Sequence, residues 1–219
     1  MAAILFDLDG TLTDPGEGIM NSVRYALARF GILRPEAAAL RDCIGPPLLE
    51  SFQKHWRLTP AESRRALELY REYFRPRGIW ENLVYPGVPE LLRDLRGAGA
   101  DLFIATSKPE EFARRIADRF GFSPYLSDVV GNTMAEDRSD KASVISYLLS
   151  SYPEAVPERT VMVGDRNLDA EGAAACGIGS VGVLYGYGSR EELESAPFTA
   201  LAASVGELRE ILLNWLRRN

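Results

Sequence analysis

The chain has 219 residues, of which 46% are hydrophobic and 26% charged, and this composition is typical of a soluble globular protein. With 31 acidic and 25 basic residues, the formal net charge is −6, which argues against nucleic acid or an anionic membrane as the main partner. Two cysteines are too few for a secreted disulfide framework or a cysteine-rich zinc site. Free thiols are typical of the reducing cytosol, so we expect a cytoplasmic protein. No apolar run approaches the roughly 20 residues that span a bilayer.

Short apolar runs alternate with helical patterns along most of the chain. The first predicted strand is 3–6, and it ends at the turn-forming residues 7–11. The further predicted strands are 101–106, 129–130, 160–164 and 179–184. The helical patterns after the first strand are 88–97, 109–120, 140–151, 168–176 and 205–216. This alternation predicts a doubly wound, Rossmann-like α/β domain with a parallel sheet.

One long segment, residues 15–83, interrupts this alternation. It contains amphipathic helical patterns at 18–30 and 60–74 and no convincing strand. We therefore expect two domains. An α/β core would comprise residues 1–14 and 84–219, and an all-helical domain would be inserted as residues 15–83.

Acidic side chains gather at the ends of the predicted strands. Asp7 and Asp165 each follow a strand, with Asp9 and Asp169 close behind them in the sequence. Because the carboxyl ends of parallel strands meet at one edge of a sheet, we expect the four side chains to converge there. Neighbouring carboxylates stay ionised together only if a cation neutralises them, and Mg²⁺ prefers such oxygen ligands. The sequence therefore predicts a magnesium site.

Other groups at the same edge suit a bound anion. Thr106 ends another strand and offers a hydroxyl, and the turn after it offers backbone N–H groups at the start of a helix. Lys141 offers a positive charge. Phosphoryl transfer needs positive charge around the phosphate oxygens and an aligned nucleophile, and a carboxylate can be that nucleophile.

These residues resemble a known family. Asp-Leu-Asp-Gly-Thr at 7–11, Thr106, Lys141 and Gly-Asp-Arg-Asn-Leu-Asp at 164–169 are similar, in this order, to the four motifs of the haloacid dehalogenase superfamily. The family places a mobile helical cap after the first motif, where this chain has residues 15–83. Residues 44–48, 106–109 and 183–188 resemble the branch of phosphoglycolate phosphatases and related 5'-nucleotidases.

The resemblance implies a role for each matching residue. Asp7 would attack phosphorus and form an aspartyl phosphate, while Asp9 would protonate the leaving alcohol and then activate the hydrolytic water. Thr106 would hydrogen-bond the phosphoryl group, and Lys141 would offset its charge. The implied magnesium ligands are Asp7, Asp9 through its main-chain carbonyl, Asp165 and Asp169. Gly10, Thr11, Ser107, Lys108 and Gly45 would contact the phosphate or the rest of the substrate.

Several of these residues have a structural interpretation beside the catalytic one. Lys108 competes with Lys141 for the role of neutralising the phosphate, and Thr106 could instead cap the helix that follows it. Asp169 is either a metal ligand, an anchor behind the ligands, or a charge at a helix N-terminus. The turn containing Gly45 is either a plain connection between helices or a loop that contacts the substrate.

The function expected from the sequence is a magnesium-dependent phosphatase acting on a small phosphorylated metabolite in the bacterial cytoplasm. Phosphoglycolate, nucleotides and sugar phosphates are all open as substrates, and the oligomeric state is open too. The alternative enzyme is a sugar-phosphate phosphomutase. A signalling protein that keeps a stable phosphoaspartate is an alternative from another class, and a protein tyrosine phosphatase is less favoured.

Overall fold

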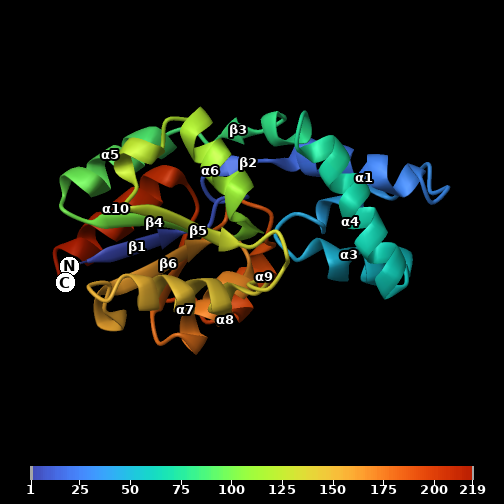
Figure 1. Cartoon of the computed structure of the whole chain (residues 1–219). Helices are drawn as coiled ribbons and strands as arrows, with labels where there is room; N and C mark the ends of the chain where they lie inside the picture. Colours follow the sequence, from blue (N-terminus) through green and yellow to red (C-terminus); the bar gives the residue numbers. More distant parts are fainter. Residues whose placement is uncertain (1, 219) are drawn as a thin grey trace. The chain divides into compact units, whose positions relative to one another are not determined.

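The computed structural model describes residues 2–218 and divides the chain into two compact units (Figure 1). One unit comprises residues 1–13 and 84–219, and the other comprises residues 14–83. The chain passes between them through β2 (Thr13–Asp14) and β3 (Leu83–Val84), which pair as a two-stranded sheet.

The larger unit is built on a six-stranded sheet with the order β5-β4-β1-β6-β7-β8. All of its strand pairs are parallel. The strands are β1 (Ala3–Phe6), β4 (Asp101–Pro109), β5 (Asp128–Asn132), β6 (Thr160–Gly164), β7 (Gly179–Val183) and β8 (Ala200–Ala202). This architecture confirms the predicted doubly wound, Rossmann-like fold. The sequence analysis missed β8.

Helices cover both faces of this sheet (Figure 1). On one face lie α5 (Val88–Gly97), α6 (Glu110–Arg119) and α10 (Val205–Leu216), and on the other lie α7 (Lys141–Ser151) and α8 (Asn167–Ala175). The short helix α9 (Arg190–Ser195), which the sequence analysis also missed, follows β7. Single 3₁₀ turns occur at Ser123–Tyr125 and Pro157–Arg159. The predicted helices are confirmed to within one or two residues.

The smaller unit consists of helices. They are α1 (Gly16–Ala28), α2 (Ala37–Arg41), α3 (Leu48–Trp56), α4 (Pro60–Phe74) and a 3₁₀ turn at Gly78–Trp80. The start of α4 agrees with the prediction because Thr59 and Glu62 form a reciprocal capping box and Pro60 suits the first turn. The sequence analysis did not predict α2 or α3.

The core of the larger unit fixes the strands whose ends carry the acidic residues. On one face, Leu5, Phe103 and Met162 from three adjacent strands pack against Val144 and Leu148 of α7, and all of them are buried. Burying this much apolar surface is the main stabilising contribution to such a domain. It holds the carboxyl ends of β1, β4 and β6 in fixed register.

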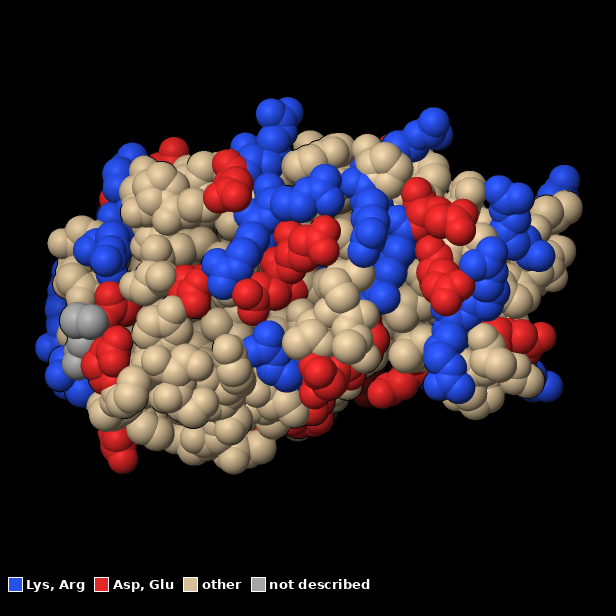
Figure 2. All heavy atoms as spheres, in the orientation of Figure 1, with Lys and Arg blue, Asp and Glu red and all other residues tan. Residues whose placement is uncertain are grey.

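The surface carries charges of both signs. On the face drawn in Figure 2, basic and acidic side chains of the described residues are interspersed rather than separated by sign. Among residues 2–218, no helix has the length and apolar character that crossing a bilayer requires.

Truncating a side chain in the central strand tests this account of the core. Leu5 is fully buried, so we expect Leu5→Ala to lower the free energy of unfolding by about 2–5 kcal/mol. The matched control is Leu83→Ala, because the Leu83 side chain is 70% exposed and its loss should cost no more than about 0.5 kcal/mol. Urea denaturation of both variants measures the difference. Equal losses would contradict this account.

Candidate active site

Two strands bring Asp7 and Asp165 together. Phe6, the last residue of β1, is paired with Val163 of β6, and the Asp7 N–H donates a hydrogen bond to the Val163 carbonyl at 2.8 Å. Asp165 follows the last residue of β6. The parallel register therefore places the two carboxylates side by side at the carboxyl edge of the sheet, as predicted.

The turn after β1 needs a glycine. The Leu8 carbonyl in this turn accepts hydrogen bonds from the N–H groups of Leu12 and Thr13, both at 3.0 Å. Gly10 in this turn has a φ of +84°, a region that favours glycine. A Cβ atom at Gly10 would lie 2.1 Å from Oδ2 of Asp165. Gly10 therefore allows the turn to approach the carboxylate closely.

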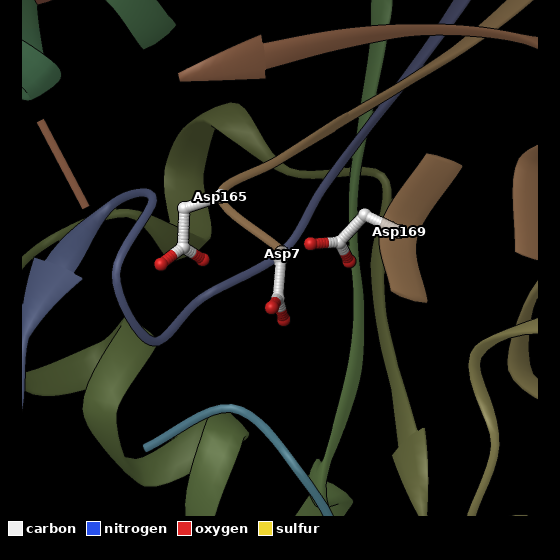
Figure 3. A group of neighbouring side chains, drawn as sticks. All are labelled: Asp7, Asp165 and Asp169. Carbon is white, nitrogen blue, oxygen red and sulfur yellow. The ribbon is translucent and has the colours of Figure 1, made fainter. Parts of the chain in front are cut away.

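Asp7, Asp165 and Asp169 form a buried group of carboxylates. One oxygen from each lies within 4.8 Å of the others. Figure 3 shows the three side chains coming from separate segments of the chain, with their carboxyl groups close together. The side chain of Asp9 is outside this group of three.

Lys141 carries the positive charge nearest to this group. Its Nζ lies 3.0 Å from Oδ1 of Asp7 and 2.8 Å from Oδ1 of Asp169. It also donates a hydrogen bond to the Ala105 carbonyl at 3.0 Å. Burial alone would lower the pKa of Lys141, but the two carboxylates raise it above its ordinary value, so the ammonium stays charged.

Lys108 has a different partner from Lys141. Its ammonium forms an ion pair with Oδ2 of Asp9, and both side chains are at least nine-tenths buried. The other carboxylate oxygen of Asp9, Oδ1, is buried without a hydrogen-bond partner. Burial raises the pKa of Asp9, and Lys108 opposes this rise only in part. The two lysines therefore serve different acids.

Asp165 and Asp169 are held by main-chain donors. Asp165 accepts hydrogen bonds from Tyr187 N at 2.8 Å and Thr11 Oγ1 at 3.4 Å, and Asp169 accepts one from Arg166 N at 3.1 Å. Burial and the nearby carboxylates raise the pKa of Asp165 well above its ordinary value. Burial and the charge of Asp7 raise the pKa of Asp169 to about 6, although Lys141 opposes the rise.

This arrangement fits a divalent cation. If every group is ionised, the four carboxylates outnumber the two ammonium groups by two, so the net local charge is −2. The groups are Asp7, Asp9, Asp165, Asp169, Lys108 and Lys141. Burial is the main cause of the raised pKa values of Asp165 and Asp169, and neighbouring carboxylates add to the rise. Three converging carboxylates are the hard oxygen ligands that Mg²⁺ takes, and Mg²⁺ usually keeps water molecules as its remaining ligands.

The structure places the remaining predicted residues as follows. Thr106 is buried, and its hydroxyl accepts a hydrogen bond from Lys108 N at 3.3 Å. It is not the cap of α6, because the N-cap residue there is Pro109. Ser107 lies between Thr106 and Lys108 and is half-buried. Gly45 belongs to the other unit, in the turn between α2 and α3 with a φ of 103°, and its contact with substrate stays a prediction.

Sequence reasoning missed the tyrosines that support the turn after β1. The Tyr185 hydroxyl donates a hydrogen bond to the Thr11 carbonyl at 3.1 Å, and its ring packs edge-on against Tyr85 with centroids 5.0 Å apart. Residues 183–188 entered the sequence analysis only through their resemblance to the phosphoglycolate phosphatase branch. Nothing in the local pattern indicated which main-chain groups they contact.

Comparison with known proteins identifies the family. Residues 4–183 match the haloacid dehalogenase-like hydrolases. The chain belongs to this family. The family expected from the four motifs is therefore confirmed, and so is the class of enzyme, a phosphoric monoester hydrolase.

Relatives of the chain carry several names. A Pseudomonas aeruginosa protein named 5'-nucleotidase is 46% identical, over 95% of this chain and 94% of that protein. A Mycobacterium tuberculosis protein named tyrosine-protein kinase PtkA is 40% identical, over 95% of this chain and 72% of that protein. A Vibrio cholerae phosphoglycolate phosphatase is 28% identical, over 96% of each chain. A crystal structure of a Clostridium acetobutylicum protein, described as a predicted phosphatase, has a TM-score of 0.92 and 38% identity, covering 97% of this chain and 98% of that one.

The raised carboxyl pKa values make the stability of the metal-free protein depend on pH. A carboxyl group with a higher pKa when folded contributes stability below its unfolded pKa and loses it as the pH rises through its folded pKa. For Asp169 this window runs from its ordinary value of 3.8 to about 6. Asp165→Asn removes a second carboxyl group whose folded pKa is raised well above its ordinary value, so this variant should lose less stability as the pH rises.

Urea denaturation of chelator-treated protein between pH 4 and pH 7 measures this effect. Between pH 4 and pH 7, the free energy of unfolding of the wild type should fall by at least ~1 kcal/mol more than that of Asp165→Asn. This difference corresponds to a shift of about one pKa unit in one group. The control is Asp118→Asn, the same change at an exposed aspartate on α6, and it should follow the wild type. Parallel curves for all three proteins would show that folding does not raise the pKa of Asp165.

Proposed function

We propose that this protein is a magnesium-dependent phosphatase that hydrolyses a small phosphomonoester through an aspartyl phosphate on Asp7. The observation that carries the proposal is the position of Asp7 in a buried site. Its carboxylate lies beside the Lys141 ammonium and within 4.8 Å of the carboxylates of Asp165 and Asp169. Such a carboxylate can attack phosphorus while fixed positive charge stabilises the phosphate oxygens.

The first half of the proposed reaction transfers the phosphoryl group. A carboxylate oxygen of Asp7 forms a bond to phosphorus as the bond from phosphorus to the ester oxygen breaks. Asp9 donates its proton to that leaving oxygen, and its raised pKa favours the protonated form that this step needs. Lys141 and the Thr106 hydroxyl contact the phosphoryl oxygens.

The second half releases phosphate. Asp9 takes a proton from a water molecule, whose oxygen attacks the phosphorus of the aspartyl phosphate. The bond between phosphorus and Asp7 breaks, and inorganic phosphate leaves. Bound Mg²⁺, held by Asp7, Asp165 and Asp169, would supply positive charge next to the phosphate. Because Asp9 can act as the base for the attacking water, the aspartyl phosphate would be hydrolysed. This favours a phosphatase over a signalling protein that keeps a stable phosphoaspartate.

The relatives suggest the substrate class. Proteins named 5'-nucleotidase and phosphoglycolate phosphatase both act on small phosphate monoesters, which supports a phosphorylated metabolite as the substrate here. We further propose that the helical unit, residues 14–83, is a cap whose turn at Gly45 contributes to specificity. A cytoplasmic location agrees with the two free cysteines, Cys43 and Cys176.

Replacing the nucleophile tests the proposal directly. We expect Asp7→Asn to lower kcat for p-nitrophenyl phosphate by at least about 10³-fold, because the amide is a poor nucleophile. Chelation should abolish wild-type activity, and added Mg²⁺ should restore it. Asp118→Asn serves as the control and should retain full activity. If Asp7→Asn remained active, the aspartyl phosphate mechanism would be wrong.

Replacing Asp9 should separate the two half-reactions. With p-nitrophenyl phosphate the leaving group departs readily without a proton, so Asp9→Asn should still phosphorylate Asp7 but hydrolyse the intermediate slowly. Stopped-flow measurements should show a burst of about one equivalent of nitrophenol per enzyme, followed by turnover lowered about 10²- to 10⁴-fold. Mass spectrometry should detect the phosphoenzyme. Slow release without a burst would exclude Asp9 as the base.

A further inference from the structure

The segment after β7 packs against the loop that carries Asp165 and Asp169. Tyr187 N donates a hydrogen bond to Oδ2 of Asp165 at 2.8 Å, and Gly188 N donates one to the Asp165 carbonyl at 3.1 Å. Both donors lie beyond residue 183, where the match to the family ends. The loop between β6 and α8 is therefore supported by a part of the chain outside that match.

Glu192 of α9 extends this support to the residues between the two acids. Its Oε1 accepts hydrogen bonds from Arg166 Nε at 2.8 Å and from Asn167 N at 3.0 Å. The Arg166 main-chain N–H in turn donates to Oδ2 of Asp169 at 3.1 Å. One carboxylate thus holds the side chain and the backbone of the turn that separates Asp165 from Asp169.

The orientation of Glu192 is itself fixed. Its main-chain N–H donates to the Ser189 hydroxyl, which caps α9, at 3.0 Å. Its side chain is only 23% exposed, so it is held against the loop rather than free in solvent. A charged acceptor in such a setting forms stronger hydrogen bonds than a neutral one.

Loss of this carboxylate has two consequences for the acids. The Asn167 N–H, in the first turn of α8, loses its acceptor, which frees the turn that sets the spacing of Asp165 and Asp169. The Arg166 side chain also loses its ion pair with Glu192, one of the contacts that hold it against the loop.

We propose that Glu192 is a positioning residue that holds Asp165 and Asp169 at the spacing a divalent cation needs. This inference rests on the proposed magnesium site. Glu192 does not contact the cation in this proposal. It acts through Arg166 and Asn167, as groups behind metal ligands do in other sites.

Calorimetric titration of the full-length chain with MgCl₂ alone tests the inference without an activity assay. We expect Glu192→Ala to weaken Mg²⁺ binding by about 10-fold or more. Glu192→Gln keeps the shape of the side chain and removes its charge, so it should weaken Mg²⁺ binding less than Glu192→Ala does. Because this change is conservative, it also shows whether a loss of binding in Glu192→Ala comes from misfolding. The matched control is Glu194→Ala, because Glu194 is an exposed residue of the same helix that pairs with Arg190 at 3.1 Å.

The outcomes distinguish this inference from the proposed function. Weaker Mg²⁺ binding in both Glu192 variants, with Glu194→Ala like the wild type, supports the positioning role. If the wild type binds Mg²⁺ and both Glu192 variants bind it equally well, the inference is wrong and the proposed function stands. A lower stability of the metal-free Glu192 variants would not change this conclusion. If the wild type binds no Mg²⁺, the metal site and the inference both fail.

Discussion

The site depends on one electrostatic constraint, which is that four buried carboxylates share two ammonium groups. Charges removed from water are tolerated only when they are paired or bound to a cation. Lys141 serves Asp7 and Asp169, and Lys108 serves Asp9, while Asp165 is left with main-chain and hydroxyl donors. The fold therefore holds a charge imbalance that favours binding of a divalent cation.

Close packing around these acids explains why small residues surround them. A Cβ atom at Gly164 would lie 2.1 Å from Cγ of Asp169, and one at Gly172 would lie 2.8 Å from Cβ of Lys141. Side chains at these positions would push the acid or the lysine out of place. Glycine lowers the intrinsic stability of the strand that contains Gly164 and of the helix that contains Gly172. Because glycine has no side chain, the charged groups can approach these positions closely.

Much of this arrangement could be predicted because its signals are local. The strand ends at Asp7 and Asp165 follow from apolar runs stopped by acidic residues, and the parallel fold then requires them to meet. By contrast, Ala200–Ala202 is too short and too weakly apolar to be recognised as a strand, and α9 has only six residues. The pairing of Lys108 with Asp9 accompanies an irregular register between Thr106 and Pro109, which the sequence pattern does not reveal.

In the proposed mechanism, the division of the charges between two lysines also separates two chemical tasks. Asp7, Asp165 and Asp169 lie around a shared space, where a cation would keep them ionised. Asp9 lies outside that group, and burial raises its pKa while Lys108 limits the rise. A group that must both give and take a proton needs a pKa near the working pH, which direct contact with a divalent cation would prevent. Pairing Asp9 with a lysine instead of the metal therefore leaves it able to exchange a proton.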